Sequence, residues 1–395
     1  MANGETDSRG TGRSCARAVG CGLVGVALVL LGVFVALALV VYGPRSGTGV
    51  PTFGGQAALE LRSRVATSVQ SFLPPKTHTP PAVKPAGSHP RIVPSSGPAI
   101  QQSPIAFSFD GIRYSITPHV ATSIYWGAKR STRLLVQTPG ESQDDWTRAY
   151  YHAFADDPAQ KAAIDDVCLQ LRAVRDKAGL DSDQYLECIA KFVQSIPYDW
   201  KAFDSNTGKQ RFAVETLVDG KGLCGDKSVL LADLLVHEGY SAALLEFGPE
   251  KHMAVGVSGP GTTYGQSAYL FLETTGPIYV TDVPEEYSGG MRLRSTPVVI
   301  AIGSGARLYN AADQIRRIIA VRDSATPSAE ALYRQAKQQQ LAPDQANAVN
   351  KKLDLAYHAA TSLRSNVVDK SGKSVGTFMD RTTAIAWIDR NAWWL

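Results

Sequence analysis

The chain has 395 residues, of which 44% are hydrophobic and 19% charged, and its formal net charge is only +4. Basic and acidic residues are interspersed, so the chain lacks the basic stripe of a nucleic-acid-binding protein and we expect no nucleic-acid partner. Its five cysteines are odd in number and have no Cys-x-x-Cys spacing, which argues against a disulfide framework. The sequence leaves open whether Cys168 and Cys188 are paired.

The N-terminal region contains a long uncharged segment. Residues 18–42 hold no charged side chain, and about 20 apolar residues are enough to span a bilayer as a helix. A cleaved signal peptide has a shorter apolar region of about 7 to 15 residues. Residues 1–17 carry three arginines, whereas only Arg45 follows the segment closely. The positive-inside rule therefore predicts a single-pass membrane anchor with residues 1–17 in the cytoplasm and the remainder of the chain outside it.

Residues 43–104 have the composition of a linker. They contain half of the 22 prolines of the chain, together with many serines and glycines. Such a segment buries too little apolar surface to fold, and its prolines favour an extended chain. We therefore expect the folded part to begin near Ile105.

Residues 105–305 carry the patterns of a domain with both strands and helices. The pair Asp110-Gly111 lies between two alternating segments, which is the signature of a β-hairpin. From Asp144 onward, apolar residues recur at helical spacing. The expected further strands are 123–129 and 133–137, and the expected helices are 144–154, 162–174 and 185–193.

Cys224 lies at the predicted start of a helix. It follows the turn-forming sequence Gly220-Lys221-Gly222, and an apolar run at 229–236 follows it before Gly239. The first N–H groups of a helix are unsatisfied, and its N-terminus is the positive end of the dipole. A thiolate is favoured there, and reactive cysteines occupy such positions. A lone cysteine is more often a small buried group, so the interpretation depends on its partners.

Two predicted strands bring an imidazole and a carboxylate together. Residues 253–257 and 268–272 are typical strands around a turn-rich loop, and the midpoint between His252 and Glu273 is the centre of that loop. Residues symmetric about the turn of an antiparallel pair have Cβ atoms roughly 5 Å apart. We therefore expect Glu273 to orient His252 beside Cys224, as in a site with a nucleophile, a base and an orienting group.

Two alternatives concern the same residues. Asp282 is the alternative acid, should Glu273 point away from the imidazole. Zinc could be bound by Cys224, His252 and Glu273, but no second histidine or cysteine lies at the spacing of metal ligands. We therefore expect neither a metal nor a cofactor.

Four motifs around these residues resemble one known family. They are F-V-Q-S-I-P-Y-D-W, F-A-V-E-T-L-V-D-G-K-G-L-C-G-D-K-S, H-M-A-V-G-V and L-E-T-T, in this order. They are similar to the membrane-anchored archaeal and bacterial branch of the transglutaminase-like fold, in the papain-like superfamily, over residues 107–280. The resemblance implies an α+β fold in which a helical part carrying the cysteine packs on an antiparallel sheet carrying the base and the acid. It also implies Cys224 as nucleophile, His252 as base and Glu273 as the third member.

The resemblance adds a candidate and a departure. In the superfamily a Gln or Trp side chain often stabilises the oxyanion with the cysteine's own N–H, and Gln194 is the candidate here, while Tyr198 and Trp200 are expected to be packing groups. Loss of one such donor costs about 10²–10³ in rate. The branch usually carries acidic residues on both sides of the cysteine, where this chain has Leu223 and Gly225. Substrate preference therefore does not carry over.

The last part of the chain is expected to close the sheet and then become helical. Residues 278–280 and 297–302 have the pattern of strands, and the helical pattern begins at Pro327. We expect residues 306–395 to form a helical extension that packs on the catalytic domain or binds an envelope protein partner. Its tail contains three tryptophans, residues that are enriched in interfaces.

The sequence predicts a membrane-anchored thiol enzyme that acts on amide bonds of a protein or peptide through an acyl-thioester. Hydrolysis would make it a protease or amidase, and transfer to an amine would make it a transglutaminase. Hydrolysis is slightly favoured because no cross-linking accessory domain is apparent. The alternative is a non-catalytic binding module of the cell envelope, which Leu223 and Gly225 favour. The joint presence of thiol, imidazole and carboxylate favours the enzyme, because binding does not require all three.

Overall fold

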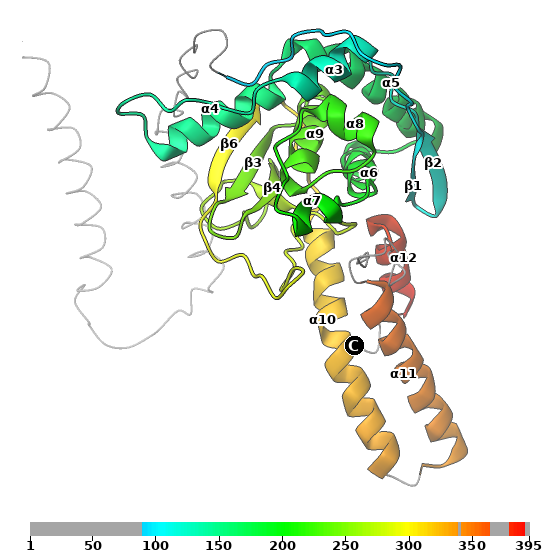
Figure 1. Ribbon diagram of the computed structural model, residues 1–395. Helices are drawn as coiled ribbons and strands as arrows, with labels where there is room; N and C mark the ends of the chain where they lie inside the picture. The colour runs from blue at the N-terminus through cyan, green and yellow to red at the C-terminus, as the bar shows by residue number, and fades with distance from the viewer. Residues whose placement is uncertain (1–88, 339–340, 364–378, 392–395) are drawn as a thin grey trace, which may run out of the picture. The chain divides into compact units, whose positions relative to one another are not determined.

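A computed structural model describes residues 89–338, 341–363 and 379–391, all within one compact unit of the chain (Figure 1). The predicted cytoplasmic tail, the predicted anchor at 18–42 and most of the predicted linker lie outside these residues. Among the helices of the described ranges, none is both long and apolar enough to cross a bilayer. The described residues form an α+β domain with an antiparallel sheet, and the expected fold class is confirmed at that level.

Helices make up most of the regular structure. The helices are α3 (Thr122–Arg130), α4 (Gln143–Ala155), α5 (Lys161–Ala178), α6 (Ser182–Gln194), α7 (Trp200–Asp204), α8 (Ala213–Asp219), α9 (Cys224–His237), α10 (Ala312–Gln338), α11 (Pro343–Ser362) and α12 (Arg381–Asn391), with a short 3-10 helix at Pro158–Gln160. The strands are β1 (Ile105–Phe109), β2 (Ile112–Ile116), β3 (Ala242–Phe247), β4 (His252–Val257), β5 (Leu270–Leu272) and β6 (Val298–Gly303).

Four strands form one antiparallel sheet in the order β5-β4-β3-β6. The central strand β3 was not expected from the sequence, because its continuous apolar run A-A-L-L lacks the alternation of a half-buried strand. Strand β3 sets Phe247 opposite His252 in β4. Alternate residues of both strands belong to two separate apolar clusters, so both faces of the sheet are buried.

Helix α9 is the centre of the domain. It contacts helices α4, α5, α6 and α8 as well as strands β3 and β4 (Figure 1). Its apolar side chains at 229–232 and 234–235 are fully buried, and burying one such side chain stabilises a fold by roughly 1.5–3 kcal/mol. The helix ends before Gly239, whose φ of +82° is the left-handed conformation that terminates helices. This packing fixes where both ends of α9 lie.

The hairpin expected at Asp110-Gly111 is confirmed, with positive φ at both turn residues. The end of the predicted linker packs on the domain before this hairpin begins. Ile92 is buried and its N–H donates to the Asp157 carboxylate at 2.6 Å. The indole N–H of Trp126 donates to the carbonyl of Pro98 at 2.8 Å. Residues 92–98 therefore belong structurally to the folded part.

Three of the expected strands are wrong. Residues 123–129 lie in helix α3, and residues 133–137 have no regular structure. The buried residues Tyr125 and Ala128 of α3 are three apart, which places them on one face of a helix. Residues 278–280 also form no strand, whereas the strand expected at 297–302 is confirmed as β6.

The C-terminal helices begin earlier than expected. Helix α10 starts at Ala312, so that Pro327 lies inside it rather than at its beginning. Ile315 and Ile318 of its first part are fully buried. Helices α10 and α11 lie side by side in opposite directions (Figure 1).

Helix α12 and the residue before it dock on the domain itself. The Lys191 ammonium of α6 contacts the Asp380 carboxylate at 2.9 Å, and the Arg381 guanidinium contacts Glu187 at 2.6 Å. Trp387 packs against the main core. The other two tryptophans of the predicted cluster lie outside the described residues.

Candidate active site

The thiol of Cys224 lies on the first residue of α9. The Asp226 carboxylate accepts the N–H of Leu223 at 2.9 Å and the N–H of Arg211 at 2.8 Å, so the acidic residue that follows the cysteine caps the helix. Cys224 is unpaired and partly exposed, and its Sγ is 3.9 Å from the carbonyl oxygen of Lys251. The helix terminus favours an anion at this sulfur, and a substrate can approach it from solvent.

His252 is the first residue of β4, and Glu273 directly follows β5. The two strands pair Val255 with Leu272, which differs by two residues from the expected register. A shift by two residues keeps every side chain on its face, because side chains alternate with a period of two. The two residues become diagonal neighbours, which long side chains can still bridge. His252 Nε2 lies 3.0 Å from Glu273 Oε2, so the expected juxtaposition is present despite the different register.

Glu273 is a buried and fully hydrogen-bonded carboxylate. Its Oε1 accepts the N–H groups of Thr274 and Thr275 at 2.9 Å and the Thr275 hydroxyl at 2.8 Å. Its Oε2 accepts the Tyr287 hydroxyl at 2.7 Å in addition to the contact with His252. Burial alone would raise the pKa of Glu273, but the charge of His252 and these hydrogen bonds lower it well below its usual range. Glu273 is therefore a fixed negative charge beside the imidazole.

The surroundings of His252 favour the charged imidazolium. Burial alone would lower the pKa of His252, but the Glu273 carboxylate, with hydrogen bonds to Cys224 and Glu273, raises it well above the usual value. Because Nε2 faces Glu273, Nδ1 is the ring nitrogen left for the sulfur. The Tyr287 ring lies 4.5 Å from the imidazole, centroid to centroid. An imidazolium beside a helix-terminal sulfur is the arrangement that favours a thiolate.

Tyr198 lies near Cys224 as well as among aromatic neighbours. Its ring packs on Trp200 and Phe203, as expected for a packing group. Burial, followed by the charge of the nearby Cys224, raises the pKa of the Tyr198 hydroxyl. The hydroxyl is therefore a candidate donor to an oxyanion formed at Cys224.

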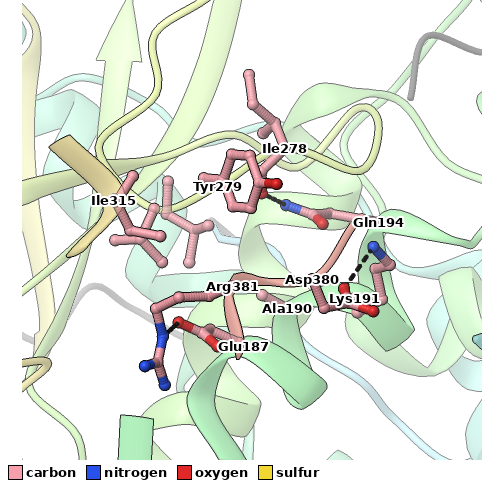
Figure 2. A pocket seen from close by; sticks show the side chains of 11 residues that line it. Glu187, Ala190, Lys191, Gln194, Ile278, Tyr279, Ile315, Asp380 and Arg381 are labelled. Carbon is pink, nitrogen blue, oxygen red and sulfur yellow. Dashed lines mark hydrogen bonds and ion pairs between the residues drawn. The ribbon is translucent and has the colours of Figure 1, made fainter. Parts of the chain in front are cut away.

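The candidate oxyanion donor Gln194 is engaged elsewhere. Its Nε2 donates to the carbonyl oxygens of Glu273 at 2.8 Å and Ile278 at 3.2 Å. Figure 2 shows it at a small cavity of about 20 Å³ beside Tyr279. These hydrogen bonds stabilise the turn after β5. The oxyanion role of Gln194 stays a prediction, which the engagement of its donor group does not favour. Asp282, the alternative acid, pairs with Arg322 at 2.6 Å instead of with His252.

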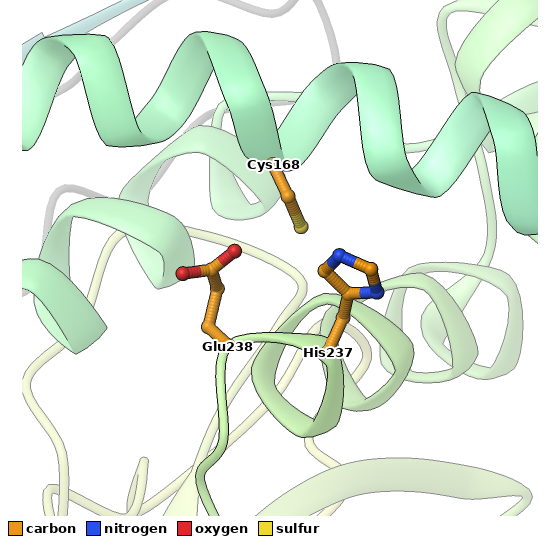
Figure 3. Close-up of side chains that lie close together, drawn as sticks. All are labelled: Cys168, His237 and Glu238. Atoms are coloured by element: carbon orange, nitrogen blue, oxygen red, sulfur yellow. The ribbon is translucent and has the colours of Figure 1, made fainter.

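A second Cys–His–Glu group lies at the other end of α9. The ligand atoms of Cys168, His237 and Glu238 lie within 4.8 Å of one another (Figure 3). These residues could hold a metal, but the Arg172 guanidinium already contacts Glu238 at 2.9 Å and His237 at 3.2 Å. A resident cation thus neutralises the carboxylate. Cys168 is fully buried, and burial followed by the nearby Glu238 charge raises the pKa of its thiol.

Sequence reasoning did not identify Tyr287 as part of the site. It lies in a turn-rich segment without strand or helix periodicity, and only the folded chain brings it to Glu273. A weak signal was available for Tyr198, which lies in the first of the four motifs. The second Cys–His–Glu group was not expected either, because Cys168 is far in sequence from His237.

Comparisons with known proteins add little to this geometry. No protein-family model and no curated protein matches the chain. A solved structure titled "Crystal structure of a TGase" is a distant match, with 15% sequence identity and a TM-score of 0.25. The match covers 41% of this chain and 42% of that structure, so the chain spans less than half of the length of that relative. A match this distant leaves the functional conclusion to the arrangement of the side chains.

Proposed function

We propose that the protein is a thiol enzyme that acts on amide bonds through Cys224, His252 and Glu273. The proposal is supported above all by the contact of 3.0 Å between His252 Nε2 and Glu273 Oε2, with the other ring nitrogen left for a helix-terminal thiol. A nucleophile, a base and an orienting group within reach of one another are the signature of nucleophilic catalysis of acyl transfer. The group at Cys168 is less suited to this chemistry, because its thiol is fully buried.

The proposed reaction has two steps. The Cys224 thiolate attacks the amide carbonyl carbon, so that a carbon–sulfur bond forms and the carbonyl oxygen becomes an oxyanion near the Cys224 N–H and the Tyr198 hydroxyl. The C–N bond then breaks, and the departing amine takes the proton of His252. In the second step water or a primary amine attacks the thioester while His252 accepts its proton. The thiolate leaves, and the product is an acid or a new amide.

The substrate is proposed to be a protein or peptide, and hydrolysis is favoured over amine transfer. Incubation of the solubilised full chain with a peptide library, with and without a primary amine, tests both points by mass spectrometry. Cleaved peptides indicate hydrolysis, whereas amine-containing products indicate transfer. Cys224→Ala should abolish both kinds of product. Equal product formation by the wild type and Cys224→Ala would contradict the assignment of Cys224 as the nucleophile.

Membrane attachment is part of the same proposal and rests on the uncharged segment 18–42. We expect the full chain to sediment with membranes and the catalytic domain to face away from the cytoplasm. A variant without residues 18–42 should be released into the soluble fraction. Protease digestion of intact cells should remove the domain from the full chain. Protection of the domain, or a soluble full chain, would contradict this part.

A further inference from the structure

Lys227 is a buried lysine one helical turn after Cys224. Its side chain is fully buried in α9, and lysine is almost never fully buried unless it is paired. Its Nζ donates to the carbonyl oxygens of Ile196 at 2.7 Å, Gln194 at 3.1 Å and Thr275 at 3.4 Å. Three acceptors match the three N–H donors of an ammonium group. The geometry therefore fits the charged form.

The three carbonyls belong to the two segments that carry other parts of the site. Ile196 lies two residues after the end of α6 and two residues before Tyr198. Thr275 lies in the turn after β5 and donates both its N–H and its hydroxyl to Glu273. Lys227 itself belongs to the helix that begins with Cys224. One buried cation thus links three segments that are far apart in the sequence.

The charge of Lys227 also acts on the sulfur. Residues three apart share one face of a helix, so Lys227 lies on the side of Cys224. The charged groups that act on Lys227 are Glu273 and Cys224, and both favour its protonated form, whereas burial lowers its pKa to about 7. Because electrostatic interactions are mutual, an ammonium at this position attracts negative charge that forms on the sulfur.

We propose that Lys227 is a positioning residue of the acyl transfer, which holds Cys224, the Tyr198 segment and the Glu273 turn in one arrangement and, in its protonated form, provides a positive charge near the sulfur. The role of Lys227 in acyl transfer rests on the proposed function. Its effect on the thiol does not, because the reactivity of Cys224 can be measured without any substrate. Lys227 contacts no reacting atom and is not a catalytic residue.

The test uses three variants at Lys227 and one control variant at Lys201, all of the full chain. Lys227→Met and Lys227→Gln remove the charge, whereas Lys227→Arg keeps it. The rate of alkylation of Cys224 by iodoacetamide is followed by mass spectrometry as a function of pH. The neutral variants should alkylate about tenfold more slowly at neutral pH, with a pH midpoint about one unit higher. Lys227→Arg should recover most of the rate, and Lys201→Met, which removes an exposed lysine of α7, should behave as the wild type.

Turnover should fall in the same variants that alkylate more slowly. With a substrate, the neutral variants should lower kcat about tenfold, because the site is displaced while the surface that binds the substrate is unchanged. KM should stay within about twofold of the wild type. Neutral variants that fold and keep the wild-type alkylation profile would overturn the proposal. Failure of both to fold would also overturn it, because Lys227 would then be required by the fold. A wild type without any turnover dependent on Cys224 would contradict the proposed function instead.

Discussion

The two ends of helix α9 carry the same three kinds of side chain. Cys224, His252 and Glu273 meet at its N-terminus, and Cys168, His237 and Glu238 meet at its C-terminus. The first sulfur is partly exposed, whereas the second is fully buried. Residue types alone therefore do not separate an active site from a packed polar cluster.

The electrostatic surroundings of the two groups are opposite. At the N-terminus the positive end of the helix dipole favours an anion, and at the C-terminus the negative end disfavours it. Glu273 raises the pKa of the imidazole it contacts. Glu238 instead contacts the Arg172 guanidinium, and burial, followed by the charge of Glu238, raises the pKa of the Cys168 thiol. The first arrangement favours a thiolate and the second favours an inert thiol.

The largest expected effect concerns the two cysteines of the comparison, Cys224 and Cys168. Cys224→Ala should lower turnover at least about 10⁴-fold, because the residues of a catalytic triad act as a unit. The matched change Cys168→Ala should leave turnover within about twofold and lower stability by about 1 kcal/mol through lost packing. Turnover of both variants is measured with the same peptide. A large loss of turnover in Cys168→Ala, together with an active Cys224→Ala, would show that the reaction takes place at the C-terminal end of α9 and contradict the account.

The second expected effect concerns thiol reactivity. Under native conditions iodoacetamide should modify Cys224 more than about 100-fold faster than Cys168, since each unit of pKa changes the thiolate fraction tenfold and burial raises the pKa of the Cys168 thiol. Denaturation should abolish the difference. Peptide mapping by mass spectrometry measures both rates in one sample. Equal native rates would show that the two ends of α9 do not differ electrostatically.

The third prediction uses the pH dependence of the N-terminal group. Glu273→Gln removes the carboxylate that keeps the pKa of His252 above its usual value. The imidazole should then lose its proton at lower pH, so that the alkaline limb of kcat/KM moves to lower pH and the rate falls by about 10²–10⁴. The control Glu238→Gln should leave the pH profile unchanged. An alkaline limb that does not move in Glu273→Gln would contradict the role of Glu273.

The smallest expected effect is that of Tyr287→Phe. The change removes one donor to the Glu273 carboxylate while the ring next to His252 stays. A hydrogen bond to a charged group contributes about 1.5–3 kcal/mol, and a loss in this range should appear in the free energy of unfolding measured with denaturant. Turnover should fall about tenfold, because Glu273 keeps its other donors. Unchanged stability and turnover would show that this hydrogen bond is not made in solution.

Much of the site could be predicted from local sequence. The glycines before Cys224 and the apolar run after it were enough to place the thiol at the start of a helix. The symmetry of the two strands placed Glu273 near His252, although a register differing by two residues makes them diagonal rather than opposite. The prediction survived because an even shift preserves the face of a strand. An odd shift would have separated them.

The features that could not be predicted depend on contacts between segments that are distant in the sequence. Strand β3 is buried on both faces, so its sequence shows no alternation. Tyr287 reaches Glu273 only because the loop before β6 folds back over the sheet. The helical pattern was expected to begin at Pro327, but this residue lies inside α10. None of these features is encoded within a short window of sequence.

The most direct test of the central claim is the location of the acyl group during turnover. The full chain is incubated with a reactive peptide ester, quenched with acid and mapped by mass spectrometry. The acyl group should be found as a thioester on the peptide that contains Cys224, and it should be absent in Cys224→Ala. An acyl group on Cys168, or turnover without any thioester at Cys224, would contradict the account.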